Sequence, residues 1–217
     1  MELSYSINAI TFAQMGLFVS ESEGVVDALK RKPPLKVDWP NAHGEVVDLS
    51  RARFEPRVIK LSCFMIAPNA EGFMNQLNAL RVELYRPGTQ RLRINPVSGR
   101  PFVYEVYCPD GVEVKKKWRN GKMFAQFDLT LIEPQPIKWI LSAPGNATAS
   151  MTLSAPSPLT FYWGDGSNTQ VQGCNQTVSH TYGGSSSAVY YLIISGELDV
   201  FASHSSTNLT EIWTRLY

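Results

Sequence analysis

The sequence predicts a mainly β protein, a barrel or sandwich, with one packed α-helix. In residues 3–10 and 101–108, successive side chains fall alternately on two faces that differ in polarity. This period of two is typical of β-strands. An Asn-Gly pair at 120–121 is the strongest short hairpin signal in the chain. Helical periodicity appears in a single segment, residues 69–85.

The first part of the chain is expected to alternate between strands and one long excursion. Residues 3–10 form a half-buried strand, and residues 57–66 return to strand chemistry with valine, isoleucine and phenylalanine. Between them, residues 20–56 combine prolines, charges and a glycine turn. Because proline lacks an amide N–H and disrupts helices, we expect short extended pieces there.

The helix at 69–85 has both a start signal and a stop signal. The side-chain oxygen of Asn69 can accept from a free amide of the first turn. One apolar face is formed by Phe73, Leu77, Leu80 and Leu84, to which we also assign Met74. An Arg-Pro-Gly segment at 86–88 ends the helix. This face is expected to pack on the core.

Residues 92–132 return to strand patterning, and residues 133–139 contain two prolines that end further strand pairing. The next stretch, rich in Ser, Ala and Pro, is expected to be a linker that runs into a short strand. Residues 1–140 carry 19 Lys and Arg against 15 Asp and Glu, and residues 141–217 carry 1 against 4. We therefore predict two domains, residues 1–140 and 141–217.

The composition is that of a globular chain and excludes several function classes. With 44% hydrophobic and 18% charged residues and a net charge of +1, the 217-residue chain has no basic field to favour nucleic acid. We identify no secretory leader and no membrane-spanning stretch. Three cysteines are too few for a disulfide framework or a zinc knuckle.

The loop Gly164-Asp165-Gly166 is the first candidate for a ligand site. It lacks the Lys-Ser/Thr of a phosphate loop, and a single carboxylate is poor evidence for calcium, which takes six to eight oxygens. The Asp-Gly pair is typical of a tight turn with positive φ. We therefore interpret Gly164, Asp165 and Gly166 as a structural turn.

Catalytic and metal-binding patterns are weak throughout the chain. The histidines, His43, His180 and His204, are far apart in sequence, and none has zinc-ligand spacing to a second ligand. A nucleophile elbow is missing, and no cysteine stands at a helix start. We expect no enzyme activity, no metal and no cofactor, although groups that converge only in space escape this reasoning.

A basic run is the one candidate contact patch: Lys115, Lys116, Lys117, Trp118 and Arg119. It fits a solvated hairpin end, or an edge strand that lysines protect from unwanted pairing. It also fits contact with a protein partner, and Trp118 among cations can stack on a nucleic-acid base. These alternatives remain open.

Several segments resemble the phage distal tail protein (Dit-like) family over residues 5–139. They are "INAITF" near the start, "LKVDWPNAHGEVVDLSRARFEPRVIKLSCFMI", the helix followed by "RPGTQRLRIN", and "FAQFDLTLIEPQPIKW". The resemblance is carried by the order of these segments. It implies a β-rich domain with one helix that closes into a homo-hexameric ring, joins tail tube to baseplate or tip, and lets tail DNA through its bore.

Residues 141–217 resemble a PKD-like, immunoglobulin-type β-sandwich. The motifs are "YWGDGS" and the later "SHTY", followed by "YYLIISG". In that family the module is a binding or spacer domain, and a domain this small is expected to lean on its neighbour. Residues 196–217 are either its closing strand or a separate leucine-rich-like rung.

We therefore expect a structural protein of a phage or prophage tail, located in the virion tail and in the host cytoplasm before assembly. Its partners would be copies of itself, other tail proteins, and a fibre or glycan at the C-terminal domain, with no specific nucleic acid and no membrane. The alternative is a surface glycan-binding or adhesion protein, which would bind sugar through exposed aromatics such as Trp163 or Trp213.

Overall fold

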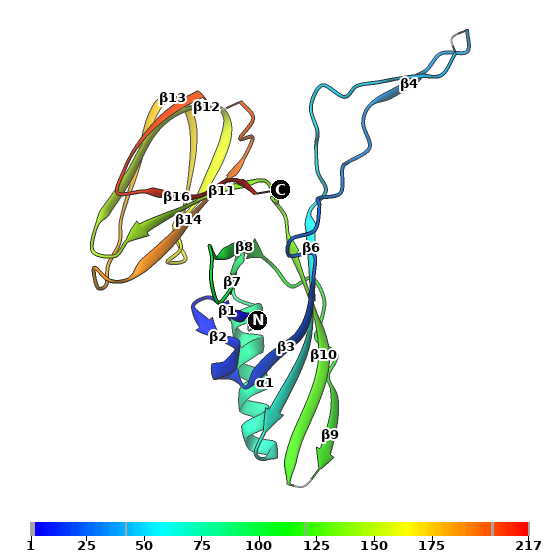
Figure 1. The fold of residues 1–217 in the computed structure, drawn as a ribbon, viewed down its shortest axis with the longest axis vertical. Helices are drawn as coiled ribbons and strands as arrows, with labels where there is room; N and C mark the ends of the chain where they lie inside the picture. Colours follow the sequence, from blue (N-terminus) through cyan, green and yellow to red (C-terminus); the bar gives the residue numbers. More distant parts are fainter. Residues whose placement is uncertain (1–2, 42, 120, 201, 217) are drawn as a thin grey trace.

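The structure is a computed structural model that describes residues 3–41, 43–119, 121–200 and 202–216. These residues form sixteen β-strands, one α-helix and one short 3-10 helix, η1 (Phe12–Met15). The predicted mainly β fold with one packed helix is confirmed. Figure 1 shows a helix-bearing N-terminal part, a C-terminal β part beside it, and a long arm that projects from the N-terminal part.

The N-terminal part contains two four-stranded antiparallel sheets. The first has the order β2-β1-β7-β8, with β1 (Ser4–Ile7), β2 (Ile10–Thr11), β7 (Gln90–Asn95) and β8 (Phe102–Val106). The second has the order β3-β6-β10-β9, with β3 (Leu17–Glu23), β6 (Arg57–Ala67), β9 (Lys115–Arg119) and β10 (Lys122–Glu133). The predicted hairpin is confirmed, because Arg119 pairs with Lys122; Asn120 lies outside the described residues.

Helix α1 (Ala70–Leu84) packs on these sheets as its apolar face predicts. Asn69 Oδ1 accepts from the amide of Gly72 at 2.7 Å, which confirms the predicted cap. The residues Phe73, Leu77, Leu80 and Leu84 are all buried. Met74 is 56% exposed, so its assignment to this face is wrong: one residue of rotation carries it off the apolar stripe. In the described residues, no helix is long and apolar enough to cross a membrane.

Residues 24–56, called the arm below, project from the body as the sequence excursion suggests (Figure 1). The strands β4 (Lys36–Asp38) and β5 (Glu45–Val47) form a two-stranded sheet in this arm. Nearer the body, the amide of Lys32 donates to the carbonyl of Arg53 at 2.9 Å. The arm is thus a narrow antiparallel ribbon that exposes most of its side chains.

The C-terminal part is a single antiparallel sheet system. It comprises β11 (Lys138–Pro144), β12 (Thr148–Tyr162), β13 (Asn168–Thr181), β14 (Val189–Gly196), β15 (Ala202–Thr207) and β16 (Thr210–Leu216). The order is β13-β12-β14-β11-β16, and β15 also pairs with β12. Since β15 and β16 belong to this system, the last stretch consists of closing strands and not of a separate rung.

The predicted linker after residue 140 is wrong, because strands β11 and β12 occupy most of it. Every second residue of β12 is buried, through Ala149, Met151, Leu153 and Ala155. Many residues in the first part of β12 are alanine, serine or threonine, and such a composition is more typical of a linker than of a strand. Residue 141 falls inside β11, and the division of the chain into domains at this residue remains a prediction.

The two parts share a small apolar core of their own. Val103 on β8 packs with Ile140 on β11 and Ile193 on β14. The ring of Phe102 stacks on Trp213 with centroids 5.4 Å apart, and the Trp213 indole donates to the carbonyl of Pro101 at 3.0 Å. The C-terminal sheet system is therefore packed on the N-terminal part.

A buried ion cluster consists of Arg57, Glu133 and Lys138. Arg57 Nε and Glu133 Oε2 are 3.3 Å apart, and Lys138 Nζ pairs with the other oxygen of Glu133. Lys138 is fully buried, and its Nζ lies 3.7 Å from the centroid of the Tyr104 ring. Burial lowers the pKa of Lys138 to about 8 and raises the pKa of Glu133. One carboxylate thus pairs with two cations.

This cluster also holds the base of the arm. Arg57 Nη1 donates to the carbonyls of Gly24 at 3.0 Å and Asp27 at 3.1 Å. Tyr104 donates its hydroxyl to the carbonyl of Val25 at 2.7 Å. The arm, the second N-terminal sheet and the first C-terminal strand therefore meet at one charged centre.

We predict that Glu133→Gln destabilises the protein more than Lys138→Met does. The first change leaves two buried cations without a counter-charge and should cost about 3–5 kcal/mol. The second keeps Glu133 paired with Arg57 and fills a similar volume, so it should cost about 1–2 kcal/mol. Urea unfolding of both variants measures the order, and equal or reversed losses would contradict it.

Candidate functional site

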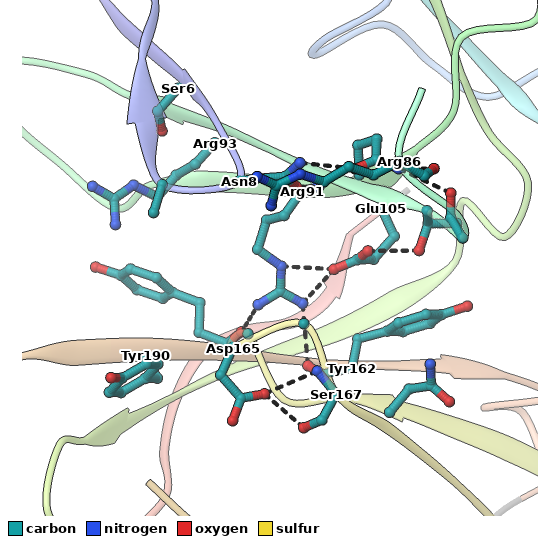
Figure 2. Close-up of a pocket in the computed structure, with 18 of the residues that line it drawn as sticks. Ser6, Asn8, Arg86, Arg91, Arg93, Glu105, Tyr162, Asp165, Ser167 and Tyr190 are labelled. Atoms are coloured by element: carbon teal, nitrogen blue, oxygen red, sulfur yellow. Dashed lines mark hydrogen bonds and ion pairs between the residues drawn. The ribbon is translucent and has the colours of Figure 1, made fainter. Parts of the chain in front are cut away.

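A cleft of about 600 Å³ lies between the first N-terminal sheet and the C-terminal sheet system, and we call it the interdomain cleft. Strand β7, the turn after β12 and strand β14 line it (Figure 2). The predicted turn residues Gly164, Asp165 and Gly166 are part of its wall. The turn is therefore placed against the other half of the molecule, a position that sequence reasoning did not anticipate.

Arg91 on β7 is the central side chain of the interdomain cleft. Its Nε donates to Glu105 Oε1 at 2.6 Å, and Thr89 donates to the other oxygen of Glu105 at 2.8 Å. Its Nη2 donates across the cleft to the carbonyl of Tyr162 at 3.1 Å, and its Nη1 donates to the carbonyl of Tyr191. One guanidinium thus binds the ends of two C-terminal strands (Figure 2).

Gly164 makes this approach possible. Its φ is 99°, and a Cβ built on it would lie 2.5 Å from Arg91 Nη1 and 2.7 Å from the carbonyl oxygen of Tyr191. Any larger side chain would displace the guanidinium or the strand. Gly166 has a similar φ of 97°, but nothing lies within 4 Å of its Cβ position. Gly164 is therefore required both for its positive φ and for the close approach of Arg91 and Tyr191.

Asp165 is tied to its own turn and to strand β13. Its Oδ1 accepts from the amide of Ser167 at 3.0 Å and from that hydroxyl at 2.6 Å. Its Oδ2 lies 2.7 Å from His180 Nε2. Burial raises the pKa of Asp165, but the bonds from Ser167 and His180 outweigh burial and hold it below its ordinary value. The carboxylate is therefore used in closing the turn.

The aromatic residues around this turn are packed against one another. The Trp163 ring stacks on His180 with centroids 4.9 Å apart, and its indole donates to Thr169 at 3.0 Å. Tyr182 donates its hydroxyl to the carbonyl of Trp163 at 2.9 Å and stacks on Tyr190. The two motifs that the sequence analysis paired, at 162–167 and 179–182, thus contact each other directly.

Two tryptophans named as exposed sugar-binding aromatics are not free. Trp163 is 1% exposed, so the expectation of an exposed ring is wrong for it. Trp213 is half-buried on Phe102, with the guanidinium of Arg100 5.6 Å from its ring centroid. Both rings were read as exposed because a single sequence does not reveal which strand face meets another sheet.

The interdomain cleft combines paired polar groups with aromatic surface. Arg91 is ion-paired with Glu105, and Asp165 is hydrogen-bonded to His180. Three tyrosines, Tyr162, Tyr190 and Tyr191, supply apolar surface beside them. Over the described residues, no group of three or more His, Cys, Asp or Glu side chains is placed to hold a metal ion.

The basic run lies away from the interdomain cleft, on strand β9 at the far end of the N-terminal part (Figure 1). All five of its residues, Lys115, Lys116, Lys117, Trp118 and Arg119, are exposed. Strand β9 pairs only with β10 and forms one edge of its sheet. The two predicted sets of site residues are therefore on separate surfaces.

Sequence reasoning missed Arg91, Glu105 and Lys138. One usable signal existed for the first: Arg91 and Arg93 alternate with Leu92 and Ile94 in β7, which marks a strand face that is not core. Lys138 gave no signal, because a lysine beside prolines at a strand exit is ordinarily exposed.

We predict that Gly164→Ala costs more stability than its matched control, Gly166→Ala. Both changes place a Cβ at positive φ, which should cost about 1–3 kcal/mol. Only the first also displaces Arg91 or the Tyr191 backbone. Urea unfolding, with limited proteolysis at residues 134–137 as a reporter of interdomain packing, measures the difference. If both variants lost the same stability and were cleaved at the same rate, the contact of the new Cβ at residue 164 with Arg91 would have no energetic effect, and the prediction would be wrong.

We predict that the stabilising effect of Asp165 depends on pH. Its pKa is lower in the folded than in the unfolded state, so its contribution is present above the ordinary carboxyl range and is lost as pH falls through the folded pKa. Asp165→Asn should cost about 1 kcal/mol at pH 7. The gap in unfolding free energy between variant and wild type should shrink as the pH falls below 3.8, the ordinary pKa of an aspartate. A gap that stays constant down to pH 3 in urea unfolding would contradict this.

Comparison with known proteins assigns the fold. No protein-family model and no curated protein sequence matches this chain. The structure is similar to the Dit (gp 19.1) protein of SPP1, a hub of the adsorption apparatus in phages that infect Gram-positive bacteria. That match has a TM-score of 0.51 and 10% identity, and covers 99% of this chain and 96% of that one.

Two structures of the phage p2 baseplate in its activated conformation are similar to the same degree. The one with strontium matches with a TM-score of 0.50 and 7% identity, over 99% of this chain and 98% of that one. The one with calcium matches with a TM-score of 0.50 and 8% identity, over 100% and 99%. The chain therefore has, over nearly its whole length, the fold of the SPP1 Dit protein and of a phage p2 baseplate component.

Proposed function

We propose that this chain is a structural, non-catalytic subunit of a phage or prophage tail, at the distal end or baseplate hub. The observation that carries the proposal is the coverage of the structural matches. Between 96% and 99% of each matched chain is aligned, so both halves correspond and not the N-terminal part alone. The independent resemblance of residues 5–139 to distal tail proteins supports the same role.

In this proposal the N-terminal part assembles with copies of itself into a ring, six-membered by resemblance, that links tail tube to tip. The matched proteins belong to a hub and to a baseplate, which supports oligomerisation and contact with other tail proteins. The arm supports it as well, since it exposes Leu35, Trp39 and Val46 in a ribbon too narrow to bury them itself. The protein would act in the virion tail, after synthesis in the host cytoplasm.

The C-terminal part is, in this proposal, a PKD-like spacer or binding module held firmly on the ring. The contact between the 162–167 turn and residues 179–182 supports the PKD-like assignment. The interdomain cleft, with three tyrosines beside Arg91, supports contact with a fibre or a glycan. A free-standing glycan-binding adhesion protein is the second candidate, and the same tyrosines are what favour it.

The test is the state of the purified chain in solution. We expect mass photometry to show a particle of six 24.2 kDa chains at high concentration, and negative-stain images to show closed rings. A strict monomer that shows no rings under these conditions would count against the tail role. A glycan array tests the second candidate, because a free-standing adhesion protein must bind sugar as a monomer.

A further inference from the structure

Three arginines line the interdomain cleft, and one of them has no ionic partner. Arg86 pairs with Glu83 at 2.6 Å, and Arg91 pairs with Glu105. Within the part of the chain that the structure describes, the side chain of Arg93 forms neither an ion pair nor a hydrogen bond. The cleft therefore contains one cation that no carboxylate of the described residues balances.

The neighbours of Arg93 explain why it is unpaired. On β7 it stands opposite Ser6 of β1 and Val103 of β8, and neither residue is charged. Its Nε is buried and has no hydrogen-bond partner among the described residues. A buried donor that stays unpaired costs free energy, so a binding partner that accepts from it gains affinity.

The contact of Arg93 with Tyr191 determines what kind of group it can bind. The Cζ of Arg93 lies 5.6 Å from the centroid of the Tyr191 ring, a cation–π contact. A guanidinium that packs its face on a ring still has its N–H groups in its own plane. These donors match the two oxygens of a carboxylate or a phosphate group. Arg93 is therefore suited to a monoanionic group.

The two carboxylates of the cleft do not occupy Arg93, because each is bonded elsewhere. Glu105 accepts from Arg91 and Thr89, and Asp165 accepts from Ser167. Their negative charges still oppose a ligand with many anionic groups. A ligand with one anionic group among neutral polar groups therefore fits this cleft better than a polyanion.

The walls of the cleft favour a saccharide over a peptide strand. Strand β7 lies between β1 and β8, and β14 lies between β12 and β11, so the backbone groups of both strands are used within their own sheets. An extended peptide would find no free strand edge to pair with. Sugar hydroxyls bind instead to side chains such as the exposed amide of Asn168.

The aromatic surface and the size of the cleft agree with a sugar ligand. The half-buried rings of Tyr162 and Tyr190 offer apolar faces on which the C–H groups of a sugar ring can pack (Figure 2). The volume of about 600 Å³ lies within the range of about 300–1,000 Å³ typical of small-molecule sites. The cleft can therefore hold a short oligosaccharide.

We propose that the interdomain cleft binds an anionic sugar unit of a polysaccharide, and that Arg93 holds its carboxylate or phosphate group. Uronic acids and sugar phosphates share this chemistry, a single negative charge beside a ring rich in hydroxyls. The inference rests on the proposed contact of the C-terminal part with a glycan. It names the class of that glycan and the residue that selects it.

The test is a glycan array that carries uronic-acid, sialylated and phosphorylated oligosaccharides beside their neutral counterparts. We expect the wild-type chain to bind anionic members ~10-fold more tightly than the neutral ones, as one charge-assisted contact provides. Arg93→Gln should remove this preference and leave the neutral members within about 2-fold. The matched control is Arg119→Gln, which removes the same charge from the exposed edge strand β9 and should bind like the wild type.

Two further measurements separate binding from folding. Because Arg93 has no ionic partner to lose, Arg93→Gln should unfold at the same urea concentration as the wild type. Arg93→Lys retains the charge but loses the planar pair of donors, so it should retain only part of the preference for anionic sugars. This second variant tests the role of residue 93 even if Arg93→Gln fails to fold.

The outcomes distinguish this site from the proposed function. A wild-type chain that binds no anionic glycan more tightly than its neutral counterpart overturns the inference, and rings in mass photometry would then leave the tail role standing. A preference that persists in Arg93→Gln and is complete in Arg93→Lys overturns the role of Arg93. If poly-glutamate binds in an Arg93-dependent manner and the glycans do not, the ligand is an acidic protein segment and the saccharide is overturned. A monomer that binds anionic glycans supports the site but contradicts the ring.

Discussion

The fold depends on one buried carboxylate, Glu133, which stands where the chain leaves the N-terminal sheets. It pairs with Arg57 at the start of β6 and with Lys138 at the start of β11, while Arg57 holds the base of the arm. A charge this deeply buried is tolerated only when its partners are fixed in place. The ion pairs of Glu133 therefore fix the position of both the arm and the C-terminal sheet. If either of them shifted, a charged group of this cluster would become exposed or lose its partner.

At the interdomain cleft, Arg91 provides a second connection between the N-terminal part and the C-terminal sheet system. Its position also gives a role to the turn at Gly164, which the sequence analysis interpreted as a local feature. The guanidinium reaches two carbonyls of the C-terminal part because Gly164 leaves the space for it. With Glu133 on one side and Arg91 on the other, the two halves are held at two separate points. Two separate contacts fix the orientation of the C-terminal sheet system relative to the N-terminal part.

The sequence allows prediction of the elements whose signals are local. The cap of Asn69, the stripe of α1 apart from Met74, and the hairpin at 119–122 each depend on residues close together in the sequence, and these are confirmed. The first part of strand β12 was predicted to be a linker because serine, threonine and alanine outnumber large apolar residues there. Lys138, Arg91 and the burial of Trp163 depend on contacts between segments more than 15 residues apart. No single-sequence pattern reports such contacts, so the interdomain cleft was found only in the structure.

The basic run shows how two interpretations of one motif can share a physical cause. Lysines on β9 repel an identical strand and in that sense protect the edge. The same charges attract a strand of opposite sign, and β3 of this sheet carries one at the correct polarity. Protection of the edge and attraction to an acidic partner are thus consequences of one charge pattern.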